Sequence, residues 1–455
     1  MGISRRGRED HDARVKLEDA LQLVAEYAIG ERIEKMKQHL APEWIEEALA
    51  LSGTVSLRRR RLPAEQVVWL VVGMGLMRDM PIEQVVDRLE LALPDREDTV
   101  VARSTISKAR ERLGDDALAY LFATTAARWA TRSADADRWK GLALYGVDGS
   151  TLRVPDSPEN REAFGGQKAG AGRGESGYPQ VRIVAMMALR SHVLSAFRFA
   201  EYGVGEVTLA RELWNEVPEK SLVIVDRNFL VKKDLIHLET SGDRHWLSRA
   251  KSNTKWAVRE KLGRNDYLVE WDVNEPGLPT TWTLRAIRYK KKGFDDVTLL
   301  TSLLDAEQYP AKELIELYHE RWELEVGYDE VKTHLLERRE AIRSKKPAGV
   351  RQELWGIAIA YNLVRVEMEA VAAEAQVPPT RISFSTSLAM IREELLGLTL
   401  PRMTPGAVPA SLKRLRRRLK RLVLPPRRAE RSYPRAVKLK MSNYGRSRPS
   451  VTRTK

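Results

Sequence analysis

The chain has 455 residues, no Cys and a formal net charge of +14. This length can bury at least one sizeable hydrophobic core, and it predicts two or three domains rather than a disordered chain. The longest apolar run, Val67 to Met77, is shorter than the ~20 apolar residues that a bilayer requires, so we expect no membrane span. The absence of Cys excludes disulfides and thiolate metal sites, and a polar amino terminus lacks a secretory signal, which together predict a cytoplasmic protein.

The positive charge is concentrated at the carboxyl end. From Pro401 to Lys455 there are 18 Lys and Arg against one acid, Glu430, so this tail carries +17 and the rest of the chain −3. A localised basic surface is what a phosphate backbone selects, and this tail has few large apolar residues to insert into a membrane. The tail therefore indicates a nucleic-acid partner, and the alternative is a solvated basic end.

Apolar residues recur at helical spacing through the first part of the chain. The predicted helices cover Leu17 to Ala28, Pro42 to Leu51, Pro63 to Met77, Pro81 to Leu91 and a segment that begins at Ser104. We expect an all-helical, DNA-binding N-terminal domain over residues 1–135. A basic run before the third of these helices could contact phosphate, or it could be a solvated charged face. It consists of Arg58, Arg59, Arg60 and Arg61.

From residue 136 to 385 the pattern predicts a mixed α/β domain, followed by a basic C-terminal region over 386–455. The predicted strands are Gly141 to Val147, Val181 to Leu189, His192 to Phe199 and Leu222 to Val225. Helical spacing returns at Glu206 to Asn215, Val231 to Glu239, Ala311 to Leu336 and Val350 to Ala373. Strand-like alternation over about 250–300 predicts a β insertion into this domain.

Two aspartates follow apolar strands. Asp148 stands at or just past the end of the strand predicted from Gly141, and Asp226 follows Leu222 to Val225. Open α/β sheets place their sites at such strand ends, and oxygen ligands suit Mg²⁺ and Mn²⁺. Each residue has an ordinary alternative, a turn at Asp148-Gly149 and a helix N-cap at Asp226.

The segment from Tyr318 to Lys332 supplies a third carboxylate. At about 100° per residue, Tyr318, Arg321, Glu325 and Lys332 share one narrow helix face. Glu325 could bind a metal ion while the other three grip phosphate oxygens. Asp329 falls on the same face and is a rival for the metal, and a surface laced with ion pairs would show the same spacing.

The spacing Tyr-x2-Arg-x3-Glu-x6-Lys in this segment resembles the signature of the insertion-sequence-four family of bacterial DDE transposases. Asp148-Gly149 and Asp226-Arg227-x-Phe229 resemble the two other catalytic boxes of that family, and residues 57–79 resemble its helical N-terminal domain. One departure is Asn228, where the family usually has Gly.

This resemblance implies an RNase H-like (retroviral-integrase-like) catalytic core of α/β class with a β insertion, and it selects Glu325 over Asp329. It implies a transposase that binds terminal inverted repeats, cleaves the element ends, forms a hairpin and joins the ends to target DNA by a cut-and-paste route. The expected cofactor is Mg²⁺, with Mn²⁺ as a substitute and two ions held by Asp148, Asp226 and Glu325. The expected assembly is a dimer on double-stranded DNA in a bacterial cell.

Further DNA contacts are expected around the β insertion. Arg249, Lys251 and Lys255 lie in a basic and amide-rich segment that resembles a family segment near the DNA end. Three tryptophans could stack on an extruded base, although packing is the commoner role of this residue. They are Trp256, Trp271 and Trp282.

Other interpretations remain for the whole chain and for one loop. A structure-selective nuclease of RNase H-like fold would lack strand joining, and a domesticated DNA-binding protein would lack catalysis. The Gly-rich loop from Phe164 to Tyr178 contains a literal G-x-G-x-x-G, but no strand leads into it, so we reject a dinucleotide site. Lys168 and Arg173 in this loop could touch DNA or belong to a plain surface loop.

Removal of residues 401–455 should weaken DNA binding and flatten its dependence on salt. A chain that makes fewer phosphate contacts releases fewer counterions from the DNA when it binds. Affinity for a terminal-repeat duplex, measured over a range of salt concentrations for the full and the shortened chain, tests this. An unchanged salt slope would refute the role of the tail.

Overall fold

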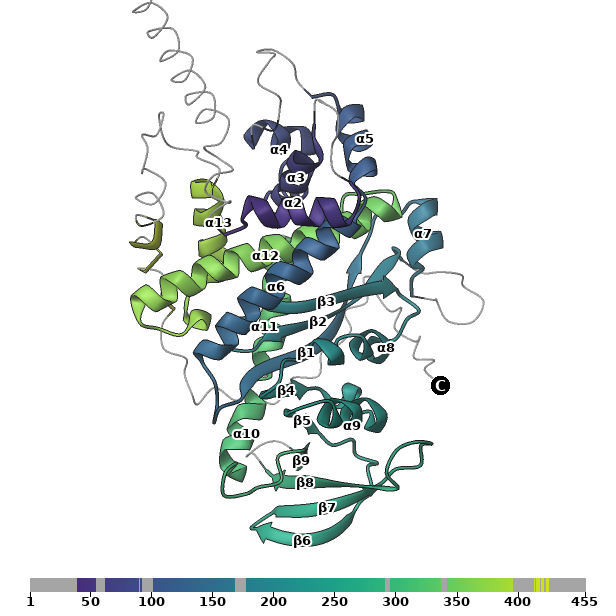
Figure 1. Ribbon diagram of the computed structural model, residues 1–455, viewed down its shortest axis with the longest axis vertical. Helices are drawn as coiled ribbons and strands as arrows, with labels where there is room; N and C mark the ends of the chain where they lie inside the picture. The colour runs from purple at the N-terminus through teal and green to yellow at the C-terminus, as the bar shows by residue number, and fades with distance from the viewer. Residues whose placement is uncertain are drawn as a thin grey trace, which may run out of the picture.

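The structure is a computed structural model, and the residues described are 39–54, 62–89, 91, 101–167, 177–290, 295–336, 342–395, 413, 415–417, 419–420 and 423–424. One nine-stranded sheet runs through the molecule, with a group of helices from the N-terminal part of the chain at one end (Figure 1). The sheet order is β3-β2-β1-β4-β5-β9-β8-β7-β6. The strands are β1 (Ala143–Arg153), β2 (Gln180–Ala188), β3 (Leu194–Glu201), β4 (Ser221–Val225), β5 (Arg244–Arg249), β6 (Ala257–Gly263), β7 (Asp266–Asp272), β8 (Thr281–Tyr289) and β9 (Val297–Thr301).

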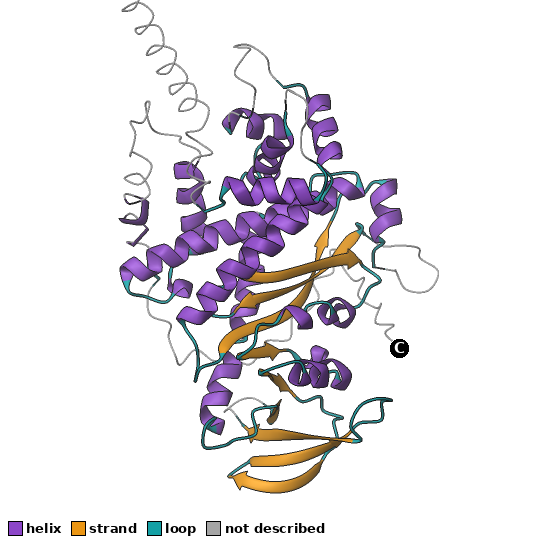
Figure 2. Cartoon of the chain, viewed as in Figure 1, coloured by secondary structure: helices purple, strands orange, loops and turns teal. Residues whose placement is uncertain are grey.

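Only the middle of the sheet is parallel. Strand β1 pairs in parallel with β4, and β4 with β5, whereas every other pair is antiparallel. All five residues of β4 are buried, as the unbroken apolar run from Leu222 to Val225 predicts for a strand covered on both faces. The strands predicted between residues 250 and 300 are present and extend the same sheet at the end far from the N-terminal helices (Figure 2).

The helical pattern of the N-terminal part is confirmed from residue 42 onward, and the helix predicted over Leu17 to Ala28 lies outside the described residues. These helices are α2 (Pro42–Leu51), α3 (Ala64–Leu76), α4 (Ile82–Arg88), α5 (Arg103–Leu113) and α6 (Asp116–Ala136). The remaining α-helices are α7 (Pro158–Phe164), α8 (Glu206–Arg211), α9 (Lys232–Thr240), α10 (Ala311–His319), α11 (Trp322–Asp329), α12 (Pro347–Ala375) and α13 (Phe384–Leu395). Short segments are η1 (Trp214–Glu216), η2 (Arg227–Phe229), the π-helical η3 (Glu330–Leu335) and η4 (Pro379–Arg381).

Two long helices cover the sheet. Phe122 of α6 and Phe197 of β3 place their ring centres 6.2 Å apart. Asn362 of α12 accepts a hydrogen bond from the Leu194 amide at 2.8 Å and donates one to the Leu194 carbonyl at 2.9 Å. These two bonds satisfy backbone groups of the edge strand β3 with a side chain of α12. Directional hydrogen bonds therefore hold α12 on the sheet in addition to the burial of apolar side chains.

Helix α12 also touches the N-terminal helices at two glycines. A Cβ on Gly75 of α3 would lie 2.7 Å from the Gly356 carbonyl oxygen of α12, and a Cβ on Gly356 would lie 2.7 Å from the Val71 carbonyl oxygen. Backbone atoms cannot move aside as a flexible side chain can, so only glycine permits this close crossing.

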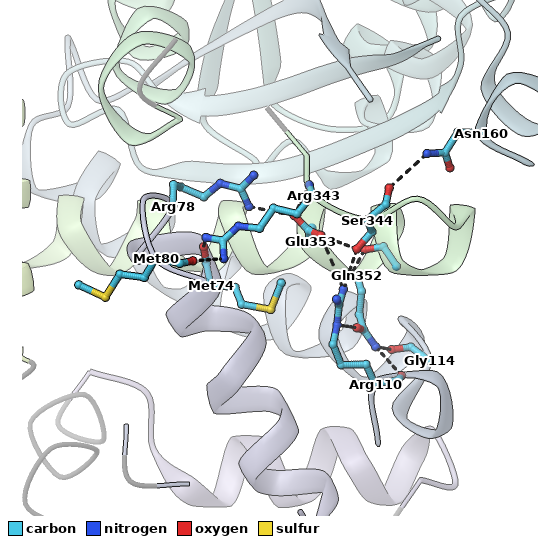
Figure 3. A network of polar contacts seen from close by, with 11 residues as sticks. Met74, Arg78, Met80, Arg110, Gly114, Asn160, Arg343, Ser344, Gln352 and Glu353 are labelled. Carbon is cyan, nitrogen blue, oxygen red and sulfur yellow. Dashed lines mark hydrogen bonds and ion pairs between the residues drawn. The ribbon is translucent and has the colours of Figure 1, made fainter. Parts of the chain in front are cut away.

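A buried charge cluster holds the same junction together (Figure 3). Glu353 of α12 accepts a hydrogen bond from Arg78 Nη1 at 2.9 Å and one from the Arg343 amide at 3.1 Å. Arg343 in turn donates to the carbonyls of Met80 and Met77 near the end of α3, at 2.7 and 2.5 Å. Burial alone would raise the pKa of Glu353, but the neighbouring arginines outweigh it and hold that pKa below its usual value. The carboxylate is therefore charged, as a buried group with several donors should be.

None of the described helices combines the length and the apolar character that crossing a membrane requires.

Substitution Gly356→Ala should destabilise the protein by about 1–3 kcal/mol, because the new methyl group forces α3 away from α12. In an exposed helix the same change would stabilise by about 1 kcal/mol, so the sign of the effect reports the close crossing. Thermal unfolding of the full chain measures it. Arg351→Ala, on the exposed side of α12, is the control and should stay within about 0.5 kcal/mol of the wild type. A Gly356→Ala variant as stable as the wild type would contradict the packing.

Candidate active site

The register between β1 and β4 brings Asp148 and Asp226 together. The last parallel pair is Val147 with Val225, so the two aspartates are the next residue on each of two adjacent strands. Neighbouring strands lie ~4.8 Å apart, which places two carboxylates at one edge of the parallel part of the sheet. The sequence predicted this edge.

The predicted end of the first strand is wrong in one respect. Strand β1 does not stop at Val147 but continues to Arg153, because its other edge stays paired with β2 as far as Gln180. The ordinary alternative for Asp148, a turn, is thereby excluded. Asp226 precedes η2 and makes no side-chain capping bond to it, so the alternative of an N-cap fails as well.

Helix α11 reaches this edge because β1 carries Gly146. A Cβ on Gly146 would lie only 2.5 Å from Leu324 Cδ2 of α11, so the helix packs directly on the strand backbone. The next residue on α11 is Glu325. Its Oε1 lies 3.0 Å from Arg321 Nη2, and the Arg321 charge also acts on Asp148 and Asp226. One guanidinium thus stands among all three candidate carboxylates.

The rival Asp329 lies elsewhere. It is exposed and accepts a hydrogen bond from the Thr333 hydroxyl at 2.5 Å. Glu323 is buried on the opposite side of the helix, with its Oε2 3.0 Å from His192 Nε2. Glu325 stays the predicted third carboxylate.

The continuous helix predicted over Ala311 to Leu336 is wrong. Helix α10 ends at His319, α11 begins at Trp322, and residues from Glu330 onward are π-helical. The amides of Glu320 and Arg321 bond to carbonyls three residues earlier, at 2.9 and 3.2 Å, which tightens the chain into a break.

The break is anchored from the sheet side. Arg190 donates to both carboxylate oxygens of Glu320, at 2.8 and 2.9 Å, a bidentate pair that fixes the turn between the two helices. Because of the break and the π-helical segment, Tyr318, Arg321 and Lys332 do not lie on one regular helix face. They reach the site separately.

Lys332 and Tyr318 approach the carboxylates from different directions. Lys332 Nζ contacts the hydroxyl of Ser150, two residues beyond Asp148 on β1. Burial lowers the pKa of Lys332, and the charges of Asp148 and Glu206 oppose this. Tyr318 is 8 % exposed, and burial raises its pKa to about 12, with Asp226 and Arg249 among the charges that act on it.

Some of the other predicted DNA contacts lie within the described residues, and the rest lie outside them. Arg249 ends β5, and Lys251 and Lys255 follow it in an exposed segment. The run Arg58, Arg59, Arg60 and Arg61 lies outside the described residues, as do Lys168, Arg173 and most of the basic tail.

The three tryptophans also differ. Trp282 is 7 % exposed, donates its indole N–H to Glu239 at 3.0 Å, and stacks on Trp271 with a ring separation of 6.1 Å. Trp271 is half-buried, and Lys232 Nζ lies 4.6 Å from its ring centre. Trp256 is half-buried and packs against the core.

Three residues near the site were missed by the sequence reasoning. Tyr328 donates its hydroxyl to the Asp148 carbonyl at 2.5 Å and accepts from the Ala185 amide at 3.1 Å. Glu206 of α8 lies against Gly149, and Trp322 is 55 % exposed directly after Arg321. Tyr328 and Trp322 stand inside the signature segment, where an aromatic residue among charges was the available signal. Glu206 carried no signal in its own segment.

Comparison with known proteins agrees with this geometry. A family model described as the N-terminal region of the insertion element 4 transposase matches residues 30–123, and one described as the transposase DDE domain matches residues 140–363. The chain is 38 % identical over 434 residues to "Transposase InsG for insertion sequence element IS4" of Escherichia coli (strain K12), which covers 93 % of this chain and 96 % of that protein. The chain belongs to this transposase family.

Two further similarities are to a curated protein, over part of the chain, and to a solved structure. "Putative transposase InsZ" of the same strain is 37 % identical over 218 residues, which cover 48 % of this chain and 71 % of that protein. The "Cryo-EM structure of piggyBac transposase synaptic complex with hairpin DNA (SNHP)" is 15 % identical, with a TM-score of 0.41 over 88 % of this chain and 87 % of that one.

The donor set of the transposase fits divalent cations, which DDE domains generally use. Carboxylate oxygens are the ligands that Mg²⁺ and Mn²⁺ prefer, and Asp148 is held among like charges that a cation would balance. Within the described residues, no three His, Asp or Glu side chains are already arranged to hold a metal ion. Glu325 Oε1 lies 3.0 Å from Arg321 Nη2 instead.

The metal affinity of the transposase should fall as the pH drops through about 6. Burial raises the pKa of Asp148 to about 6, Gly149 and Arg321 oppose the rise, and Asp226 and Glu206 add to it. A proton competes with a cation for the carboxylate, so the charged form is present above this pKa and lost below it. We expect roughly tenfold weaker Mn²⁺ binding at pH 5 than at pH 7, measured on the full chain. Equal affinity at both values would contradict the shift.

Proposed function

We propose that this transposase binds the terminal repeats of its insertion sequence, cleaves the element ends and joins them to target DNA. The proposal is carried by one observation. The β1–β4 register makes Asp148 and Asp226 the next residues after a paired position, α11 packs on Gly146 one residue before Glu325, and the Arg321 charge acts on all three carboxylates, which supports a shared site. Asp148, Asp226 and Glu325 would hold the divalent metal, which when bound would supply activation of the attacking oxygen and charge stabilisation of the leaving one.

The flanking side chains of the chain would hold DNA. Arg321 pairs with Glu325, Lys332 contacts Ser150 near Asp148, and the Asp226 charge acts on Tyr318. A guanidinium, an ammonium and a phenol all donate to phosphate oxygens. When Glu325 turns to the metal, Arg321 loses a partner and can take a phosphate oxygen instead. The same side chain would then serve as counter-ion before metal binding and as phosphate grip after it.

Arg249, Lys251 and Lys255 would extend the phosphate contacts along the edge at which β5 ends, with the N-terminal run from Arg58 to Arg61 as a further contact. Trp256 and Trp271 keep part of their rings exposed and would be the first candidates for stacking on an extruded base. Trp282 would take part only if the rings and Glu239 around it moved. A cut-and-paste route through a hairpin and a dimer on DNA complete the proposal, on the strength of family membership.

Incubation of the full chain with terminal-repeat duplexes and Mg²⁺ tests the function. Wild type should produce cleaved and joined strands, whereas Asp148→Ala, Asp226→Ala and Glu325→Ala should each lose on the order of 10³-fold in cleavage or more. The matched control is Asp329→Ala, which removes an exposed carboxylate four residues from Glu325 and should cleave like wild type.

The products separate the alternatives. Cleavage without joined strands would indicate a structure-selective nuclease, and binding without cleavage would indicate a domesticated DNA-binding protein. If Glu325→Ala cleaves as well as wild type while Asp329→Ala does not, the third carboxylate is assigned to the wrong residue.

A further inference from the structure

Glu206 reaches the candidate active site from the opposite face of β1. Successive residues of a strand point to opposite faces, so Asp148 faces α11 and Gly149 faces α8. A Cβ on Gly149 would lie 2.6 Å from the Glu206 Cδ atom and 3.0 Å from its Oε2. The carboxylate of Glu206 therefore rests on the backbone of the residue that follows Asp148. A Cβ at position 149 would require the Glu206 side chain to shift.

Both oxygens of this carboxylate are engaged. Oε2 accepts a hydrogen bond from Asn228 Nδ2 at 3.2 Å, and Oε1 lies 3.1 Å from Arg182 Nη1. Asn228 stands two residues after Asp226, and Arg182 lies on β2 opposite Thr151. One side chain thus joins the segment that bears Asp226 to β1 and β2.

The Arg182 end of this connection is itself fixed. Arg182 Nη2 donates to the Tyr202 carbonyl at 3.0 Å, and the guanidinium carbon lies 4.8 Å from the Tyr202 ring centre. The Asn228 end is exposed and belongs to the short helix η2, in which Phe229 is buried. The bond to Glu206 therefore gives the Asp226 segment a second attachment, beside the buried Phe229 side chain.

The amide of Asn228 is the group that makes this bond possible, because an amide can donate to a carboxylate.

The charge of Glu206 also acts on the site. It is one of the negative charges that raise the pKa of Asp148, and it opposes the lowering of the Lys332 pKa. A further negative charge behind Asp148 strengthens the attraction of this edge for a divalent cation.

We propose that Glu206 is a positioning residue of this transposase: through Gly149 and Asn228 it sets the placement of Asp148 relative to Asp226, and its charge raises the affinity of the pair for a divalent cation. This inference rests on the proposed function, since it concerns the same carboxylates. It does not make Glu206 a metal ligand, because both of its oxygens already have partners.

The experiment measures Mn²⁺ binding to the full chain without DNA, with the free ion detected by electron paramagnetic resonance. Thermal unfolding of each variant is measured separately in the absence of metal. Glu206→Ala should bind Mn²⁺ about 10–100-fold more weakly than wild type, as is usual when the support of a ligand is removed. Glu206→Gln, which keeps the shape and loses the charge, should fall between the two. The matched control is Glu212→Ala, a largely exposed carboxylate that follows the same helix and pairs with Arg198. It should bind like wild type.

Asn228→Ala separates positioning from simple support of the fold, because the residue is exposed and its loss should leave the unfolding temperature unchanged. Its Mn²⁺ affinity should nevertheless fall several-fold, and its effect should not add to that of Glu206→Ala, since both remove one bond. If Asn228→Ala and Glu206→Gln both bind Mn²⁺ like wild type, Glu206 supports only the fold and the inference is overturned. If Asp148→Ala binds Mn²⁺ as tightly as wild type, the proposed function itself fails instead.

Discussion

The closeness of three elements at strand β1 is the constraint on which the candidate site depends. Gly146 admits Leu324 of α11 on one face, and Gly149 admits Glu206 of α8 on the other. A Cβ at position 146 would lie 2.5 Å from Leu324 Cδ2, and one at position 149 would lie 2.6 Å from Glu206 Cδ, so the facing side chain would have to move. Asp148 lies between these two glycines, so the strand carries little side-chain bulk next to its negatively charged carboxylate. Charges on both faces therefore act on one carboxylate.

The positions of the two aspartates could be predicted because a strand buried on both faces leaves an unbroken apolar run in the sequence, as Leu222 to Val225 does. Their closeness could not be predicted from either run. It depends on the pairing of Val147 with Val225, a tertiary register that no local pattern encodes. The length of β1 was underestimated for the same reason, because its second half is held by β2 rather than by its own apolar residues.

The third carboxylate shows the limit of predictions made from helix periodicity. Spacing at 3.6 residues per turn assumes one regular helix, but the bonds at Glu320 and Arg321 and the π-helical segment from Glu330 interrupt it. The family signature still selected Glu325, because it is defined by spacing along the sequence and does not depend on helix geometry. Neither helix periodicity nor the family spacing could identify Glu206. It is a single acidic residue at the start of a short helix, and only the fold places it beside Asp148.

Helix α12 belongs to two parts of the molecule at once. Its first half crosses α3 at Gly356 and carries Glu353 into the arginine cluster, and its second half holds the edge strand β3 through Asn362. The helical N-terminal region and the sheet therefore do not behave as interchangeable modules. A recombination event that brought in a different N-terminal region would also have to supply a helix α12 with glycine at the crossing and a carboxylate at the cluster. A single helix therefore ties the packing of the two regions to one another.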